Sequence, residues 1–370
     1  MLALGSPDLS FLKDVPLLVV LLLPLLKLST LAEDKLATGE LAFANVQNER
    51  PMYLRLVSGK LFRVSGECSE TSSDDGASWV RGGRINPYGI GGALSDSEIQ
   101  LQSGTWKGRI LVPYYLEMDG DHPDYSREQR GGYAVWKGEK ILLETHTHVP
   151  EMAGSFMCYS DNEGATWNVS KGFLMGYFED GRLGHWSCEE PVVAELKDGR
   201  VVCFMRSTCG RILKSCSSDG GVYWTKVKAT DLAMSNSPCA LARIPATGDL
   251  VLVWNRMSAD EIRRGYRRGR LSIAISKDDA QTWENIRTLE LSPGIEDLTR
   301  VEPPDLTAMV RGSSGPDAPL GEVPDGFTHF HYPNVYFSDN KIFIKYLVST
   351  LDGKSGYRWR VFPISWLYAD

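Results

Sequence analysis

The sequence predicts an all-β protein, a six-bladed β-propeller made of four-stranded antiparallel blades. Two observations predict it. A short cassette of turn residues occurs four times, and the cassettes are separated by short apolar runs with no long helix-periodic segment. We expect residues 36–370 to form this single propeller domain, preceded by an apolar N-terminal segment within residues 1–32.

The four cassettes have the chemistry of a tight turn. They read Ser-x-Asp/Asn-x-Gly/Ala-x-x-Trp in "SSDDGASW", "SDNEGATW", "SSDGGVYW" and "SKDDAQTW", and their tryptophans are 88, 57 and 59 residues apart. Asp and Asn side chains accept hydrogen bonds from backbone amides two residues on, and Gly allows a positive φ. The tryptophan ring then packs beneath the turn. Such a unit, repeated every 50–60 residues or so, is typical of stacked or radial supersecondary structure.

The segments around each cassette predict one blade. In "EEPVVAELKDGRVVCFMRS" two strands flank the hairpin turn "KDGR", and a third strand, "GRILKSCS", leads into the cassette. A fourth strand after the cassette completes a four-stranded antiparallel blade. The same layout recurs in "MYLRLVSGKLFRV", "SPCALARIPATGDLVLVWN" and "FHYPNVYFSDNKIFIKYLVS".

Chain length sets the expected number of blades. About 335 residues follow Ala32, and at roughly 55 residues a blade they correspond to six blades. Five blades can be located in the sequence, so the sixth would be shared between the two ends of the chain. Blade 2 carries extra length, which we assign to a loop around "EMDGDHPDYSREQRGG".

Composition and charge exclude some partners. With 42% hydrophobic residues the chain can bury a large core, and a formal net charge of −7 argues against nucleic acid or an anionic membrane surface as partner. The apolar stretch Val15–Leu28 is interrupted by proline and shorter than the about 20 residues that span a bilayer, so no transmembrane helix is expected. It resembles a signal peptide with a cleavage site after Ala32, which would make the protein secreted or periplasmic. An uncleaved anchor or an unrelated extension are the alternatives.

The cassettes resemble the Asp box of the sialidase (neuraminidase) superfamily, whose members are six-bladed propellers. The segment "CEEPVVAELKDGRVVCFMR", Cys188–Arg206, is similar to the sialidase stretch Asn-Glu-x-x-Val-x-Glu-Leu-x-Asp-Gly followed by an arginine. The resemblance runs from about Arg50 to the C-terminus. Asp boxes are structural turns, so they imply the fold and not the chemistry.

The resemblance implies a site on the axial face, where the inner strands begin. Sialidases bind the substrate carboxylate with three arginines and use a tyrosine nucleophile activated by a glutamate; the matching positions are Arg50, Arg206, Arg268, Tyr332 and Glu190, with Glu189 as the alternative glutamate. The residue types suit this chemistry. A planar guanidinium binds a carboxylate through two hydrogen bonds, and a phenol becomes a nucleophile when a carboxylate takes its proton.

The general acid of sialidases, an aspartate, has no clear counterpart. Between Arg50 and the first cassette the carboxylates are Glu67 and Glu70, and another loop would have to supply an aspartate, with Asp96, Asp119 and Asp121 as candidates. The leading function is therefore a sialidase-like exo-glycosidase acting on a terminal anionic sugar of a glycan or glycoconjugate. A glycan-binding propeller without activity, or a polysaccharide lyase that uses Tyr332 with His146 or His331, are the alternatives.

The sequence predicts no cofactor and no resident metal. The seven cysteines have neither zinc-site spacing nor a disulfide framework, and no cofactor motif occurs. One alternative is "LLETHTH", in which Glu144, His146 and His148 alternate and would share one face of a strand, as metal ligands can.

Overall fold

The computed structural model describes residues 53–89, 91–93, 97–117, 133–136, 139–142, 153–177, 185–264, 266–304, 306 and 319–369. The N-terminal segment, with its expected signal peptide, lies outside the described residues. Among the residues described, no helix is long and apolar enough to cross a membrane.

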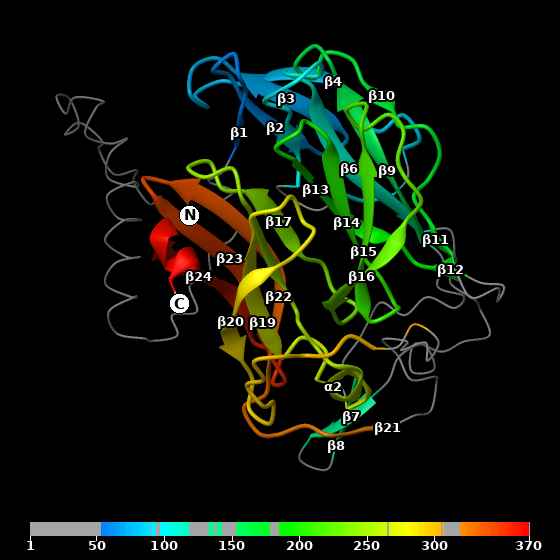
Figure 1. The fold of residues 1–370 in the computed structure, drawn as a ribbon, viewed down its shortest axis with the longest axis vertical. Helices are drawn as coiled ribbons and strands as arrows, with labels where there is room; N and C mark the ends of the chain where they lie inside the picture. Colours follow the sequence, from blue (N-terminus) through cyan, green and yellow to red (C-terminus); the bar gives the residue numbers. More distant parts are fainter. Residues whose placement is uncertain are drawn as a thin grey trace, which may run out of the picture.

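Antiparallel sheets follow one another in chain order (Figure 1). Blade 1 contains β1 (Leu54–Arg55), β2 (Leu61–Ser65), β3 (Cys68–Ser72) and β4 (Val80–Arg84). Blade 2 contains β5 (Ile99–Gln100), β6 (Ile110–Glu117), β9 (Ala153–Ser160) and β10 (Asn168–Val169). Blade 3 contains β13 (Glu189–Glu195), β14 (Val201–Arg206), β15 (Arg211–Ser217) and β16 (Lys228–Ala233).

Blade 4 contains β17 (Ala240–Arg243), β18 (Leu250–Trp254), β19 (Arg270–Ser276) and β20 (Glu284–Leu291). Blade 5 has three strands, β22 (Thr328–Ser338), β23 (Lys341–Thr350) and β24 (Ser355–Pro363), and the 3-10 helix η2 (Ile364–Tyr368) follows it. The all-β, propeller-like arrangement of four-stranded antiparallel sheets is thus confirmed. The predicted order of three strands, cassette and fourth strand holds in blades 1 to 4.

The described residues form five blades where we predicted six. The prediction divided chain length by blade length, but part of that length forms other elements. β7 (Tyr133–Trp136) and β8 (Glu139–Leu142) make a hairpin that pairs in parallel with β21 (Pro319–Glu322), and Figure 1 places this sheet at the lower end of the view. β11 (Gly176–Tyr177), β12 (His185–Trp186) and the helix α2 (Ala259–Arg263) also belong to connections between blade strands.

The four cassettes form one and the same turn. In each, the hydroxyl of the first serine lies 2.7–3.0 Å from the Asp or Asn oxygen two residues on and accepts a hydrogen bond from the amide four residues on. In three of them the tryptophan Nε1 donates to the carbonyl three residues earlier, at 3.0–3.1 Å. The tight turn predicted from the sequence is confirmed, but the Asp or Asn oxygen accepts from the amide four residues on and not two.

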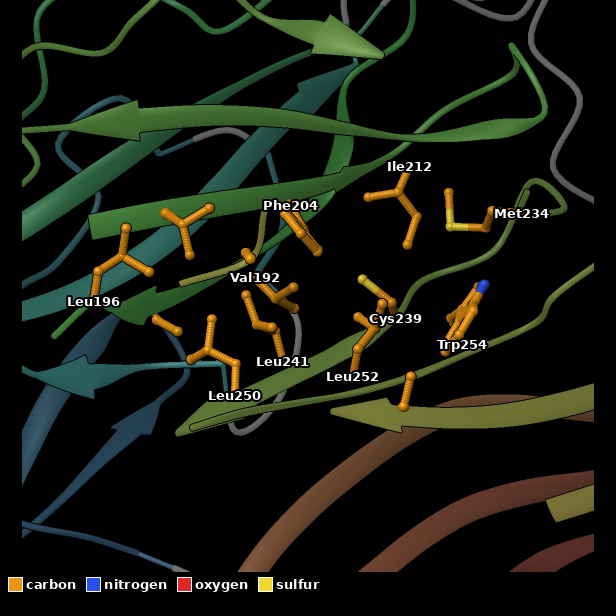
Figure 2. Packing of buried hydrophobic residues seen from close by; sticks show 14 residues of the cluster. Val192, Leu196, Phe204, Ile212, Met234, Cys239, Leu241, Leu250, Leu252 and Trp254 are labelled. Carbon is orange, nitrogen blue, oxygen red and sulfur yellow. The ribbon is translucent and has the colours of Figure 1, made fainter. Parts of the chain in front are cut away.

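Apolar side chains fill the space between neighbouring blades. Figure 2 shows this packing between blades 3 and 4, where Phe204 and Ile212 of one sheet face Leu252 and Trp254 of the next. All four side chains are fully buried. Trp254 also donates its Nε1 hydrogen to the carbonyl of Ala233 at 3.0 Å, so its one polar atom is satisfied inside the core.

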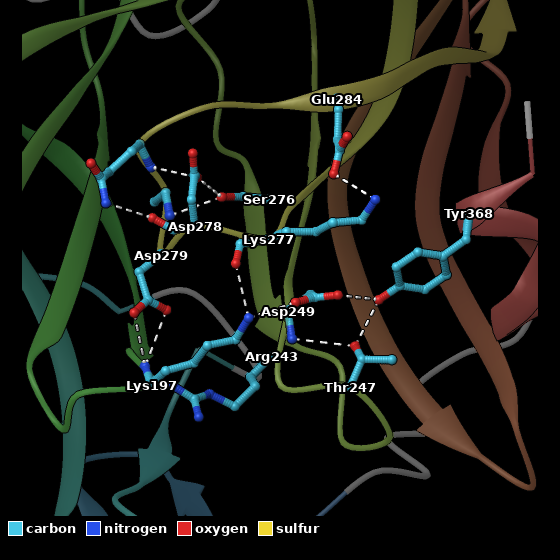
Figure 3. A network of polar contacts seen from close by, with 12 residues as sticks. Lys197, Arg243, Thr247, Asp249, Ser276, Lys277, Asp278, Asp279, Glu284 and Tyr368 are labelled. Carbon is cyan, nitrogen blue, oxygen red and sulfur yellow. Dashed lines mark hydrogen bonds and ion pairs between the residues drawn. The ribbon is translucent and has the colours of Figure 1, made fainter.

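A polar network joins the hairpin turns at the far ends of the inner strands β13 and β17 (Figure 3). The Nζ of Lys197, in the β13–β14 turn, lies 2.7 Å from the carboxylate of Asp249, which also accepts a hydrogen bond from the Tyr368 hydroxyl at 2.8 Å. Asp279, in the fourth cassette, accepts from the amide of Lys197. The network therefore ties blades 3 and 4 and the C-terminal η2 together, away from the strand starts.

Candidate active site

The inner strands β13, β17 and β22 are neighbours and lie toward the middle of the molecule in Figure 1. The candidate site is at the end where these strands begin. Glu190 is the second residue of β13 and Tyr332 the fifth of β22. Arg206 ends β14 and is paired with Glu189, whereas Arg268 lies two residues before β19 begins.

Glu190 and Tyr332 occupy equivalent β-bulges. In β13 the pairs Glu189–Arg206 and Val192–Phe204 leave two residues, Glu190 and Pro191, opposite one. In β22 the pairs on either side likewise leave Tyr332 and Pro333 opposite one residue of β23. A bulge re-aims a side chain, and proline, which cannot donate to the ladder, suits such a position.

Both bulge residues have a left-handed backbone. The φ angles are 43° for Glu190 and 48° for Tyr332, a region that non-glycine residues adopt at a cost of roughly 1–2 kcal/mol each. Strain of this kind is often found where a side chain must point in one particular direction. Here it turns a glutamate and a tyrosine, 142 positions apart in the chain, toward one another.

Arg206 is a buried cation paired with two glutamates. Its Nη1 lies 2.9 Å from the carboxylate of Glu190, and its Nε lies 3.4 Å from that of Glu189; all three side chains are at least 95% buried. Nε also donates to Oδ1 of Asn236 at 2.5 Å. Burial opposes the charged guanidinium, but the two carboxylates outweigh burial and hold the pKa of Arg206 above its usual value.

Arg268 is also held at the site, but by neutral groups. Its Nη1 lies 2.6 Å from Nδ1 of His331, and its Nη2 donates to the backbone carbonyl of Asn236 at 3.3 Å. The guanidinium carbon is 5.7 Å from the ring centre of Tyr332, a cation–π distance. Burial and the positive charge of Arg206 lower the pKa of Arg268. Among the described residues Arg268 forms no ion pair with a carboxylate, so its charge stays available to an anion.

The side chains of Tyr332 and Glu190 lie close enough for the Glu190 carboxylate to act on the phenol. Burial, together with the negative charge of Glu190, raises the pKa of Tyr332, while Arg268 and Arg206 act in the opposite direction. The phenol is therefore protonated at neutral pH. Its proton has an acceptor already in place, the carboxylate of Glu190.

Two histidines border the tyrosine on β22. The rings of His331 and Tyr332 are stacked with centres 6.5 Å apart, and His329 packs edge-on against His331. Burial, then the charges of Arg268 and Arg267, lower the pKa of His329 to about 3. Burial and Arg268, with His329, lower the pKa of His331 to about 2. Both imidazoles are neutral at physiological pH.

The structure brings together four of the five residues singled out from the sequence: Glu190, Arg206, Arg268 and Tyr332. Arg50 lies outside the described residues. The alternative glutamate, Glu189, is present as a second partner of Arg206. The geometry therefore permits the predicted grouping, and the described residues contribute two of the three predicted arginines.

The candidate acids are not at this site or are not described. Glu67 and Glu70 belong to blade 1, where they form partly exposed ion pairs with Arg84 and Arg63. Asp96, Asp119 and Asp121 lie outside the described residues, as do the predicted loop of blade 2 and the metal-ligand candidates Glu144, His146 and His148. Within the described part of the chain no group of three or more His, Cys, Asp or Glu side chains could hold a metal ion.

Sequence reasoning missed Asn236, which touches both arginines, through Oδ1 and through its backbone carbonyl. The signal that could have found it is positional. "SNSP" stands before the inner strand of blade 4, as "CEEP" and "FHYP" stand at those of blades 3 and 5. A proline that follows a polar residue at the start of an inner strand thus marks the site in three blades.

These features define a class of protein: a β-propeller whose blades are closed by Asp-box turns, with a tyrosine, a glutamate and arginines where the inner strands begin. A family model described as BNR repeat-like domain matches residues 52–344. The chain belongs to this family of BNR repeat-like domains.

Solved structures similar to this chain include sialidases. An intramolecular trans-sialidase from Ruminococcus gnavus is 14% identical, with a TM-score of 0.45, 82% of this chain and 51% of that chain covered. A leech intramolecular trans-sialidase is 14% identical, with a TM-score of 0.44, 81% and 36% covered. A protein of unknown function from Dyadobacter fermentans is 15% identical, with a TM-score of 0.40, 88% and 87% covered. The chain thus spans about half or less of the length of the two trans-sialidases.

Proposed function

We propose that this protein is a sialidase-like exo-glycosidase that acts on a terminal anionic sugar, of the sialic acid type, in a glycan or glycoconjugate. The observation that carries the proposal is the grouping of Tyr332, its proton acceptor Glu190 and the arginines Arg206 and Arg268 at the start of the inner strands. Membership of the BNR-repeat family supports the fold on which the proposal depends.

In the proposed reaction the Tyr332 oxygen attacks the anomeric carbon while its proton passes to Glu190. The bond to the leaving group breaks, and the leaving oxygen takes a proton from solvent or from one of the candidate acids Asp96, Asp119 and Asp121. A glycosyl–tyrosine intermediate forms; water later adds its hydroxyl to the sugar and gives up a proton, and Tyr332 regains its own proton from Glu190. A neutral phenol suits an anionic sugar, because a carboxylate nucleophile would repel the substrate's own carboxylate. Arg268, whose charge is not offset by a described carboxylate, would bind the substrate carboxylate.

The second candidate is a glycan-binding propeller without activity. It is favoured by one observation: Glu67 and Glu70, the carboxylates expected near the family's acid, are committed to ion pairs on blade 1. Departure of the leaving group needs an acid, so its loss would leave binding without turnover. His331 does not suit the lyase alternative as a base, because its Nδ1 is already engaged by Arg268.

The test is hydrolysis of a fluorogenic sialoside by the wild type, Tyr332→Phe and Glu190→Gln. We expect turnover by the wild type and a loss of about a hundredfold or more in kcat for each variant, because each removes one partner of the proton transfer. Tyr336→Phe is the matched control. Tyr336 lies on the same strand and its ring packs against Trp359, so loss of its hydroxyl should leave kcat unchanged.

Two outcomes would contradict the proposed hydrolase mechanism or the proposed activity. Full activity of Tyr332→Phe would exclude the tyrosine nucleophile. No turnover from pH 4 to 8, together with measurable binding of sialic acid by calorimetry, would favour the glycan-binding protein.

A further inference from the structure

The contact between Arg268 and His331 fixes the state of the imidazole. A guanidinium has donors and no acceptor, so at 2.6 Å from Nη1 the Nδ1 atom of His331 must be the acceptor. A neutral imidazole that accepts at Nδ1 carries its proton on Nε2. The same imidazole is stacked on the Tyr332 ring, so it is a neighbour of both the proposed nucleophile and a proposed carboxylate ligand.

The groups around the imidazole keep it neutral. Arg268 faces it directly, His329 packs against it from the same strand, and Tyr332 stacks on it. The positive charge of Arg267 also acts on His329. A second proton on His331 would place a cation 2.6 Å from the guanidinium of Arg268 in a half-buried setting, which is costly. The acceptor for Arg268 is therefore an uncharged imidazole at neutral pH.

An uncharged acceptor has a consequence for the two arginines. Arg206 is held by two glutamates, so most of its charge is already offset. Arg268 is held by an imidazole nitrogen and a backbone carbonyl, which orient the guanidinium without neutralising it. The two arginines thus differ in what they can offer an anion.

We propose that His331 is a positioning residue: it orients Arg268 while leaving its positive charge for the carboxylate of the substrate. The inference rests on the proposed function, because it assigns a role at that same site. The alternative, in which His331 is needed only for packing on β22, makes different predictions for substitutions of different charge.

The test compares three substitutions of one residue. His331→Asn keeps a neutral acceptor, because Oδ1 of Asn occupies nearly the place of Nδ1. His331→Leu removes the acceptor, and His331→Asp holds Arg268 but neutralises it. The readout is the Kd of the sialic acid glycal 2-deoxy-2,3-didehydro-N-acetylneuraminic acid by calorimetry, with thermal unfolding of each variant alongside.

We expect binding by His331→Asn to stay within about threefold of the wild type. His331→Leu and His331→Asp should each weaken binding by about ten- to a hundredfold, the range of one charge-assisted hydrogen bond. The control is His329→Asn, on the same strand, for which a change below about threefold is expected. If His331→Asp binds as tightly as the wild type, or if the affinities simply follow thermal stability, the proposal is wrong.

A second measurement does not depend on the ligand. Nitrogen-15 NMR of labelled histidine, with His331→Asn for assignment, should show a neutral ring with its proton on Nε2 from pH 5 to 8. A charged ring, or a proton on Nδ1, would overturn the proposed orientation of Arg268. If the wild type shows this tautomer but does not bind the glycal, the proposed function fails and so does the assignment of a substrate carboxylate to Arg268.

Discussion

Replacing Arg206 by methionine tests the charge balance on which the candidate site depends. Arg206 is 3% exposed and is the cation against which Glu189 and Glu190 are buried, at 3.4 and 2.9 Å. Methionine fills much of the same volume, so the change removes the charge and leaves most of the packing. What remains is a pair of adjacent buried carboxylates without their partner.

The expected loss in the free energy of unfolding at pH 7 is about 3–5 kcal/mol, the cost of breaking a buried ion pair by removing one partner. The loss should depend on pH. Without the cation, the folded variant takes up a proton that the unfolded chain does not bind at the same pH, so its stability rises as pH falls. We therefore expect the difference in the free energy of unfolding between wild type and variant to become smaller as the pH is lowered from 7 to 5.

The assay is urea denaturation of both proteins at several pH values. Arg200→Met is the matched control: it belongs to the same β13–β14 hairpin, and its partner Asp198 is, like itself, 48% exposed, so its loss should cost about 0–1 kcal/mol. The double variant Glu189→Gln, Arg206→Met should recover part of the loss. A loss that is equal at every pH, and that Glu189→Gln does not relieve, would refute the reasoning and assign the cost to packing.

Two further predictions concern the turns and the thiols. Burial is the largest single influence on Asp278 in the fourth cassette and opposes its ionisation, but the hydrogen bonds from Thr282 and Ser276 together outweigh burial and lower its pKa to about 2. Asp278→Ala should therefore cost about 1 kcal/mol at neutral pH, as loss of a capping side chain does, and the difference in urea denaturation should shrink as pH falls from about 4 toward 2; a difference that does not change with pH would contradict this. Burial raises the pKa of Cys158 and of Cys239 to about 12, so in the native protein iodoacetamide should label the half-buried Cys68 well before either, as followed by mass spectrometry. Equal labelling rates in the folded protein would show that the core opens more readily than its packing implies.

The blade was predictable because its information is local. Each cassette closes within eight residues through hydrogen bonds among its own serine, aspartate or asparagine and backbone, so neighbouring segments are not needed to form it. The hairpin at Lys197–Arg200 is equally local, with Gly199 at a φ of 83° in the turn. Length alone did not predict the five blades that the described residues form, because connections such as the β7–β8 hairpin, β21 and α2 also use chain and add no blade strand.

The candidate site was predictable in part. The residue types and the resemblance to sialidases pointed to Glu190, Arg206, Arg268 and Tyr332, all of which lie at one end of the inner strands. The contacts that these residues make were not predictable, even where the proline pattern marks a residue of the site such as Asn236. Asn236 contacts Arg206 across 30 positions of sequence and Arg268 across 32, and nothing local to "SNSP" indicates either contact.

The sequence by itself determined the turns, the strand order within a blade and the residue types of the site, because these depend on side chains a few positions apart. Only the tertiary structure decided which arginine has its positive charge offset by carboxylates and which does not. That difference depends on the two glutamates beside Arg206 and on the neutral His331 beside Arg268, 63 positions away in the chain. The glutamates and Arg206 meet within blade 3, where β13 pairs with β14, whereas Arg268 and His331 meet only when blades 4 and 5 pack side by side. Charge compensation depends on these distances, which the folded chain fixes.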